Sequence, residues 1–376
     1  MSVVYKKLED VCEILDSRRV PITAKDRKAG TYPYYGANGL QDYVADYIFD
    51  DELVLLAEDG GNFGSKERPI AYRVSGKCWV NNHAHVLKAK SNMHVDYLCY
   101  ALMFYDTEGI VNGATRQKLT QAAMRQMVIP YRDMTEQLQI IKKISQIVRS
   151  IEKRKEELQL LDQLVKSRFI ELFGDPKQNP KGYPVKEFDE ISVLITDGEH
   201  ATPRRTDKGI YLLSARNILN HALQLDDVDY IDEEEYTRIA RRVVPQAGDV
   251  LISCSGSIGR CCVVPEELRF QMVRSAALIR FDDTIKPVFA EWLITSDELQ
   301  RQISMSATQS SQANLFQGKI RKLRGYVPPM ELQNQFAAFV EQTDKSKYYS
   351  SLSFRYCQAA ANTYRQEWMT CRTSDF

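Results

Sequence analysis

The sequence predicts an α+β protein in which two mixed α/β domains are joined by two long helices that form an antiparallel coiled coil. Three observations support this prediction. An amphipathic segment with a seven-residue period lies near the middle of the chain, the order of predicted elements occurs twice, and 44% of the 376 residues are hydrophobic. A chain of this length and composition is typical of a globular protein with two domains. The duplicated order indicates an internal pseudo-two-fold repeat.

The segment 133–174 has the pattern of a long amphipathic helix. Asp133 with Glu136 three residues later resembles a capping box, and Gly174 is a typical stop signal. At about 1.5 Å per residue such a helix would be roughly 60 Å long. Its narrow seam is typical of a coiled coil and needs a partner helix. The seam residues recur every seven positions: Ile144, Ile151, Leu158, Val165 and Leu172.

The order of predicted elements repeats after this helix. Hydrophobic runs followed by glycine-rich turns lie at 51–64 and again at 248–259, and the segment 129–140 is matched by 327–336. We therefore expect a first globular domain at 1–132, a long helix at 133–174, a linker at 175–183, a second globular domain at 184–329 and a second long helix at 330–370. The second helix is the natural antiparallel partner of the first.

The second predicted helix has a less regular seam. The repeat places Phe336, Val340 and Phe354 on the apolar side, but the heptad row through Val340 also meets Lys347. A flanking row with the same spacing passes through the hydroxyl side chain of Ser350. The segment after position 348 is aromatic and serine-rich, so it is atypical for a coiled coil. Whether it continues as a full helix is left open.

The charge and hydropathy of the chain limit its class. Lysines and arginines balance aspartates and glutamates at 50 each, which argues against a protein that coats nucleic acid through bulk charge. No hydrophobic run approaches the ~18 residues of a membrane span. The N-terminal residues lack the apolar core of a signal peptide, so we expect a cytoplasmic protein.

The cysteines and histidines give weak metal signals. Cys254 with Cys261 and Cys262 could form a zinc site, but no histidine is near in sequence and buried thiols are the favoured interpretation. His83 and His85 form an H-x-H pair without an evident third ligand, so structural roles are favoured there too. We predict no metal site in this chain.

Catalytic motifs are missing from the sequence. There is no G-x-x-x-x-G-K-[ST] phosphate loop, no glycine-rich S-adenosylmethionine loop and no N-P-P-[YF] motif. A nuclease or methyltransferase acting in its own right is therefore disfavoured, and no catalytic residue is predicted.

Several short motifs occur in a duplicated order that is more specific than any one of them. They are Ile129-Pro130 with Gln137, Phe173-Gly174-Asp175-Pro176, Gly248-Asp249-Val250-Leu251-Ile252, Ser257-Ile258-Gly259, and Val327-Pro328-Pro329 with Gln333. In this order they resemble the specificity (S) subunit of type I restriction–modification enzymes. The resemblance covers nearly the whole chain and weakens after about Tyr348.

This resemblance implies a function without catalysis. Each globular domain would be a target recognition domain that reads one half of a bipartite double-stranded DNA target. The helices would space the two domains and dock two methyltransferase (M) subunits, and restriction/translocation (R) subunits would complete the complex. S-adenosylmethionine, ATP and Mg are then expected on the partner subunits and not in this chain.

Reading DNA requires polar and basic side chains on loops that can enter a groove. The best candidates are Thr115, Arg116, Gln117 and Lys118 in the first domain, and Thr308, Gln309, Ser310, Gln312 and Asn314 at the equivalent place in the second. Further candidates are Asn38, Arg204, Arg205, Arg216, Asn217, Ser257 and Arg260. Each of these could instead be a solvated loop residue.

Two glycine-rich turns could hold phosphate through backbone N–H groups. For Gly60–Gly64 a plain hairpin turn is favoured, whereas Gly256–Arg260 adds an arginine and hydroxyls, so a phosphate contact and a plain turn are about equally supported. The charged face of the first helix, around Lys142 and Arg149, is expected to be solvated or to face a partner protein.

An alternative from another class is a non-catalytic coiled-coil scaffold that tethers two protein-binding domains. The zero net charge is compatible with such a scaffold. Salt dependence separates the two hypotheses, because DNA binding weakens steeply as the salt concentration rises.

Overall fold

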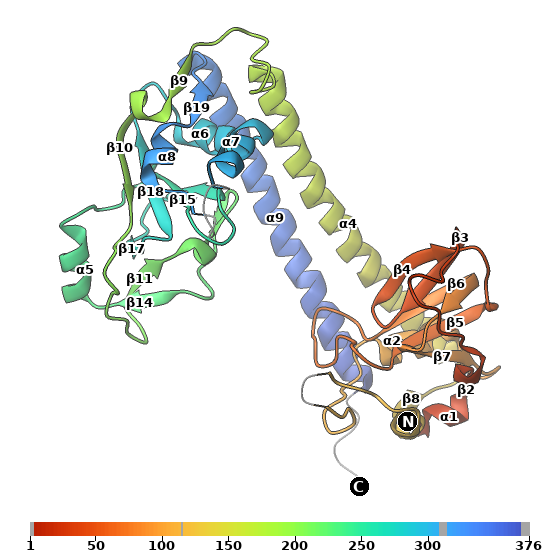
Figure 1. Cartoon of the computed structure of the whole chain (residues 1–376). Coiled ribbons are helices and arrows are strands. Elements are labelled where there is room, and N and C mark those ends of the chain that lie inside the picture. The colour runs from red at the N-terminus through yellow and green to blue at the C-terminus, as the bar shows by residue number, and fades with distance from the viewer. Residues whose placement is uncertain (1–3, 114–115, 308–313, 370–376) are drawn as a thin grey trace. The chain divides into compact units, whose positions relative to one another are not determined.

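The computed structural model describes residues 4–113, 116–307 and 314–369 (Figure 1). The chain divides into two compact units. Unit 1 comprises residues 1–155 and 352–376, and unit 2 comprises residues 156–351. Within the described residues, no helix combines the length and the apolar character needed to cross a membrane.

Unit 1 is built on a mixed sheet of six strands, ordered β2-β7-β5-β6-β3-β4. The pairing of β3 with β6 is parallel and the other pairings are antiparallel. Strand β5 pairs with both β7 and β6, and it ends in a continuous hydrophobic run, residues 53–57, that is entirely buried. The strands are β2 (Cys12–Ile14), β3 (Ala29–Gly36), β4 (Gly39–Val44), β5 (Phe49–Ala57), β6 (Ala71–Val80) and β7 (Ala84–Ala89).

Unit 2 contains a four-stranded sheet, ordered β10-β18-β15-β16, and a three-stranded sheet, ordered β14-β11-β17. The order β10-β18-β15-β16 corresponds to β2-β7-β5-β6 of unit 1, and the parallel pair β11–β17 corresponds to β3–β6. The two short strands β16 and β17 together therefore take the place of the long strand β6. The strands are β10 (Ser192–Asp197), β11 (Ile210–Leu213), β14 (Asp229–Ile231), β15 (Val250–Ser253), β16 (Cys261–Val263), β17 (Phe270–Met272) and β18 (Ala276–Phe281).

In each unit, the short strand that precedes the long helix in sequence pairs with the first strand of the globular part. In unit 1, β1 (Val4–Lys7) pairs with β8 (Val128–Tyr131), and in unit 2, β9 (Val185–Glu187) pairs with β19 (Arg324–Tyr326). In both units, the first and last strands of the globular part are therefore joined. The remaining short elements are α1 (Leu8–Val11), η1 (Asp16–Arg18), α2 (Val95–Leu102), α3 (Gln121–Gln126), η2 (Phe188–Glu190), η3 (Ala215–Asn217), β12 (Ile218–Leu219), β13 (Ala222–Leu223), α5 (Glu233–Ala240), α6 (Pro287–Ile294), α7 (Asp297–Ala307) and α8 (Gln317–Arg321).

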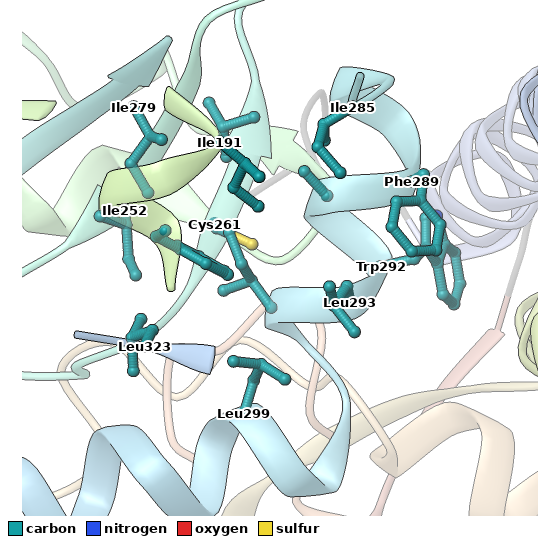
Figure 2. Close-up of a cluster of buried hydrophobic side chains, with 14 of the residues drawn as sticks. Ile191, Ile252, Cys261, Ile279, Ile285, Phe289, Trp292, Leu293, Leu299 and Leu323 are labelled. Carbon is teal, nitrogen blue, oxygen red and sulfur yellow. The ribbon is translucent and has the colours of Figure 1, made fainter. Parts of the chain in front are cut away.

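The largest buried cluster of unit 2 lies between its four-stranded sheet and the helices α6 and α7 (Figure 2). Ile252, Cys261 and Ile279 come from the sheet, and Phe289, Trp292 and Leu293 come from α6. The first turn of α6 starts with a proline at position 287. Proline suits a helix start because the backbone N–H that it lacks would have no helical partner at this position.

The two long helices are α4 (Met134–Phe173) and α9 (Met330–Met369). Within unit 2 they pack together, with the ring of Phe336 edge-on to Phe169 at 5.4 Å between centroids. Lys347 Nζ lies 2.8 Å from Asp162 Oδ1. Moving forward along α9 from 336 to 347 therefore means moving backward along α4 from 169 to 162, so this contact is antiparallel. The second helix continues beyond position 348, the point left open by the sequence.

The predicted seam residues of α4 and α9 are all buried or partly buried. On α9, however, the buried heptad row passes through Phe336, Thr343 and Ser350 and differs from the row through Lys347. Phe336, Thr343 and Ser350 follow one another at intervals of seven residues, and Thr343 and Ser350 are 5% and 6% exposed. Thr343 Oγ1 donates to the carbonyl of Phe339 at 2.9 Å, which allows this hydroxyl to be buried without an unpaired donor.

Candidate nucleic-acid interface

Three loops of unit 1 meet beyond the end of β5. Asn38, in the turn between β3 and β4, donates from Nδ2 to the carbonyl of Gly60 at 3.0 Å. Gly60 N in turn donates to the carbonyl of Gln117 at 3.3 Å. Segments that are far apart in sequence therefore present their exposed polar side chains at one place. The predicted residues Asn38, Arg116, Gln117 and Lys118 are all exposed there.

The basic side chains of this surface are held by acids from the neighbouring loop. Arg116 Nη2 lies 2.8 Å from Asp59 Oδ1, and His83 Nδ1 lies 2.6 Å from the same oxygen. Lys118 Nζ lies 3.1 Å from Glu58 Oε1. The guanidinium of Arg116 remains 62% exposed and the Lys118 side chain 50% exposed. Both cations are thus positioned yet still accessible to an anionic ligand.

A cluster of buried polar side chains is hydrogen-bonded to this loop at Leu119. His85 is fully buried, with Nδ1 2.6 Å from Asp16 Oδ2 and Nε2 2.9 Å from the carbonyl of Leu119. Arg19 donates to Glu58 at 2.7 Å and lies 3.5 Å from Asp16. Two carboxylates therefore face one guanidinium and one imidazole, and the cluster ties the loop at Leu119 to the sheet.

Asp16 titrates at lower pH than an ordinary aspartate. Burial alone would raise its pKa, but hydrogen bonds from His85, the Val86 N–H and Gln121, together with the charge of His85, outweigh burial and lower the pKa. An ionised Asp16 and a backbone carbonyl are both acceptors. Each lies within hydrogen-bond distance of one ring nitrogen of His85, so both nitrogens are already engaged by groups of the protein.

Asp16, Glu58 and His85 are the one group among the described residues with ligand atoms close enough to hold a metal ion. The guanidinium of Arg19 already supplies the positive charge between the two carboxylates. The geometry therefore fits a structural ion-pair cluster better than a cation site, in line with the structural role favoured for this histidine.

One backbone hydrogen bond of unit 2 is equivalent to a bond of unit 1. Leu315 N donates to the carbonyl of Cys254 at 2.9 Å, just as Leu119 N donates to the carbonyl of Glu58 at 2.7 Å in unit 1. Leu119 and Leu315 are both buried, at 0% and 1% exposed. In each unit a buried leucine is thus hydrogen-bonded to the segment that follows a central strand, β5 in unit 1 and β15 in unit 2.

The next residue pair outward is also equivalent. Asn314 pairs with Ser255 in an isolated antiparallel bridge, and Lys118 pairs with Asp59 in the same way. The glycine that follows, at positions 60 and 256, has a left-handed backbone in both units, with φ of 63° and 68°. A residue with a Cβ would be strained at this turn.

A pocket of about 460 Å³ lies beside this loop in unit 2. Its described lining consists of four serines, two arginines, an alanine and a glycine, a set suited to an anion such as phosphate. Ser253 Oγ shapes the loop by donating to the carbonyl of Ser257 at 2.6 Å and accepting from Arg260 N at 3.0 Å. The lining residues are Ser214, Ala215, Arg216, Ser255, Gly256, Ser257, Arg260 and Ser275.

The predicted arginines of unit 2 differ in how far they are neutralised. Arg216 Nη2 and Arg205 Nε lie 3.0 and 2.9 Å from the two carboxylate oxygens of Asp229. Arg204 is paired with Asp232 and Glu234, and the hydrogen bond that it donates to Glu234 is the largest cause that raises its pKa. Within the described part of the chain, the side chain of Arg260 has no such partner.

The structure corrects one predicted DNA contact. Asn217 is completely buried, and its Nδ2 donates to the carbonyls of Gln224 and Asp227 at 3.0 and 2.9 Å. Its Oδ1 accepts from the Ser214 N–H at 2.9 Å. The amide is used up in holding the loop, so it cannot read a base. Four other predicted positions in this unit, and one in unit 1, lie outside the described residues: Thr308, Gln309, Ser310, Gln312 and Thr115.

The clustered cysteines are buried thiols of the sheet. Cys254, Cys261 and Cys262 are 6%, 0% and 1% exposed. Burial raises the pKa of Cys254 and of Cys262 to about 12, and it also raises the pKa of Cys261 well above its ordinary value. Thiols in this state are poor metal ligands and poor nucleophiles.

Sequence reasoning missed the acidic and basic partners of the two loops. Asp16, Arg19 and Glu58 are 39 or more positions from at least one of the groups that they bind. No local pattern marks them, because a buried ion pair between distant segments has no sequence period. In the sequence, the H-x-H pair of His83 and His85 was the one motif that pointed to this cluster.

Comparison with known proteins gives a family match for part of the chain and a relative that covers most of it. Residues 2–161 match the family model described as the type I restriction modification DNA specificity domain. A protein of Haemophilus influenzae (strain Rd), named as a type I restriction enzyme specificity subunit, S.HindORF215P, is 26% identical over 358 residues. That match covers 90% of this chain and 87% of the relative.

Two solved structures share the fold. The S subunit of a type I restriction–modification system from M. genitalium matches with a TM-score of 0.62 at 12% identity, over 99% of this chain and 96% of that one. A chain from a type I R-M system, solved to study complex assembly and conformational transition, matches with a TM-score of 0.55 at 14% identity, over 98% of each chain. The resemblance of this chain to the specificity subunits of type I restriction–modification enzymes, first seen in its motifs, is therefore confirmed.

Proposed function

We propose that this chain is the DNA sequence-specificity subunit of a type I restriction–modification complex. In this proposal each globular domain reads one half of a bipartite double-stranded DNA target. The long helices act as an antiparallel coiled coil that spaces the domains and docks two methyltransferase (M) subunits. Restriction/translocation (R) subunits complete the complex, and a cytoplasmic location is part of the same proposal.

One observation carries the proposal: the same backbone hydrogen bond occurs at equivalent places in both units. Leu119 N donates to the carbonyl of Glu58 in unit 1, and Leu315 N donates to the carbonyl of Cys254 in unit 2. A protein that reads two half-sites needs one reading surface per domain, built on a common frame with different side chains. Arginine, glutamine and asparagine on these loops can pair with base edges, and the serine-lined pocket suits a phosphate.

Catalysis is assigned to the partners. Specificity subunits are generally non-catalytic, and we place adenine methylation, ATP use and DNA cleavage on the M and R subunits. S-adenosylmethionine, ATP and Mg would accordingly be bound by those subunits. The role of this chain is then to orient its partners on one DNA sequence.

Methylome sequencing tests the proposal directly. Cells that carry this chain with its methyltransferase partner should show an adenine-methylated motif made of two short halves and a spacer of fixed length. Deletion of this chain alone should remove that motif and leave other methylated motifs in place. Persistence of the motif without the chain would contradict the proposal and leave the coiled-coil scaffold as the better hypothesis.

A further inference from the structure

Each long helix carries a fully buried glutamine in its first turn. Gln137 is the fourth residue of α4 and Gln333 is the fourth residue of α9, and both side chains are 0% exposed. A buried primary amide is costly unless its oxygen and both of its N–H groups find partners. Neither residue takes part in the loops described above, so their burial needs another explanation.

Gln137 bonds three backbone groups of unit 1. Its Oε1 accepts from His94 N at 2.8 Å, and its Nε2 donates to the carbonyls of Asn92 and Arg132 at 3.0 and 2.8 Å. His94 is the N-cap of α2, the helix that packs on the sheet through β5 and β6. Arg132 lies in the link between β8 and α4.

Gln333 makes the same three bonds in unit 2. Its Oε1 accepts from Lys286 N at 2.8 Å, and its Nε2 donates to the carbonyls of Thr284 and Pro328 at 3.0 and 2.8 Å. Lys286 is the N-cap of α6, and Pro328 lies in the link between β19 and α9. The three distances equal those around Gln137, and the partners occupy the same places relative to the short and long helices.

The bonded groups explain what the amide does. In each unit it joins the long helix, the link that enters it and the N-terminus of the helix that covers the sheet. All three bonds are to backbone atoms, so they fix the direction in which the long helix leaves the globular domain. A hydrophobic side chain could fill the same space but could not hold this direction by hydrogen bonds.

We propose that Gln137 and Gln333 are positioning residues that lock each recognition domain onto its own helix and so restrict the spacer length that the protein accepts between half-sites. This inference rests on the proposed function. Spacer length depends on where each reading surface lies relative to its helix. Base preference depends on the loops, and among the described residues the hydrogen bonds of these glutamine side chains go to other segments.

The test uses the full chain in complex with its methyltransferase partner. The variants are Gln137→Met and Gln333→Met, and the matched controls are Gln139→Met and Gln335→Met, which alter exposed glutamines two residues further along the same helices. The substrates are plasmids that carry the motif read from the wild-type methylome, with the native spacer and with spacers one base pair shorter and longer. The readout is the methylated fraction at each spacer relative to the native spacer.

We expect relative methylation at the altered spacers to rise about tenfold in the two lock variants, the factor that corresponds to one net hydrogen bond. The controls should match the wild type. Gln137→Asn provides a second variant if the methionine variant folds poorly, because its neutral amide avoids a buried charge but is one methylene too short to reach all three backbone groups.

The possible failures can be told apart. If the wild-type complex methylates no split motif, the proposed function fails before any variant is made. If the wild type reads a split motif and the lock variants lose activity equally at every spacer, the glutamines serve stability alone and the inference is overturned. Unchanged spacer preference with unchanged activity would overturn it as well.

Discussion

Arg116 and Asp59 come from two loops of unit 1 and lie 2.8 Å apart, from Nη2 to Oδ1. The same carboxylate oxygen is 2.6 Å from His83 Nδ1, so Asp59 is itself fixed by a residue next to β7. An exposed guanidinium is thereby ordered before any ligand arrives. Ordering a side chain in advance reduces the entropy that binding must offset.

Arg116→Ala should weaken or relax recognition of one half-site and leave the other unchanged. If the guanidinium contacts a base edge, the loss is about 1–3 kcal/mol of binding free energy. Methylation of targets with single base changes in each half measures this. Lys28→Ala is the control, because Lys28 lies at the other end of β3 from the turn that contains Asn38. Equal loss at both half-sites would contradict the assignment of Arg116 to one half.

Arg260→Ala should act differently, since the pocket that it lines suits a phosphate. Binding should weaken about equally for all base changes, and the slope of log K against log salt should fall by about 1. Binding of the intact complex to DNA, measured by fluorescence anisotropy at several salt concentrations, gives both quantities. Wild-type binding that does not change with salt would instead favour the scaffold hypothesis.

Asp16→Asn should destabilise unit 1, because it leaves the buried His85 without its carboxylate. Removal of one partner of a buried ion pair costs about 3–5 kcal/mol. The pKa of Asp16 is lowered in the folded state, so its stabilising contribution is present above the ordinary aspartate pKa and is lost as the pH falls through the lower, folded value. The difference in unfolding free energy between wild type and variant should therefore be full at pH 7 and shrink below about pH 4.

Chemical denaturation at pH 7 and at acidic pH, followed by circular dichroism, measures this difference. Asp26→Asn is the control, since Asp26 is exposed and its carboxylate accepts a hydrogen bond from the nearby Thr23 Oγ1. A difference for Asp16→Asn that stayed constant down to pH 2 would show that the carboxylate charge is not the source of the stability.

Phe336→Ala should destabilise the junction of the two helices in unit 2. Phe336 is fully buried, and its ring packs edge-on against Phe169, Phe173 and Trp292 at 5.4, 5.6 and 6.0 Å between centroids. Truncation of a buried phenylalanine costs about 3–5 kcal/mol. Urea unfolding of the full chain checks this value. The control Phe316→Ala removes a ring that is 62% exposed and should cost less than about 0.5 kcal/mol.

The long helices and their seam are predictable because a heptad period is a local property of the sequence. The row on α9 was harder, because Thr343 and Ser350 count as polar although both are buried. A threonine in a helix can bond its hydroxyl to the carbonyl four residues earlier, as Thr343 does to Phe339. Hydropathy alone therefore hides such positions in a seam.

The candidate site was only partly predictable. Loops rich in Arg, Gln and Asn point to a reading surface, but the sequence does not tell which amides are free. Asn217 looks like a reader by composition, yet it is spent on three backbone partners. The acids that hold the readers, such as Asp59 and Asp229, become visible only when distant segments are brought together.

The carboxylates that pair with the arginines of unit 2 also have a consequence for sequence specificity. Asp229 is shared by Arg205 and Arg216, and Glu234 and Asp232 both face Arg204. An arginine that turns toward DNA leaves a bare negative charge behind, close to the phosphate backbone. On a DNA-reading surface, a duplex that offers these arginines good acceptors would compensate for that repulsion, whereas a poorly matched duplex would be pushed away. Discrimination would then come from rejecting wrong sequences as much as from holding the right one.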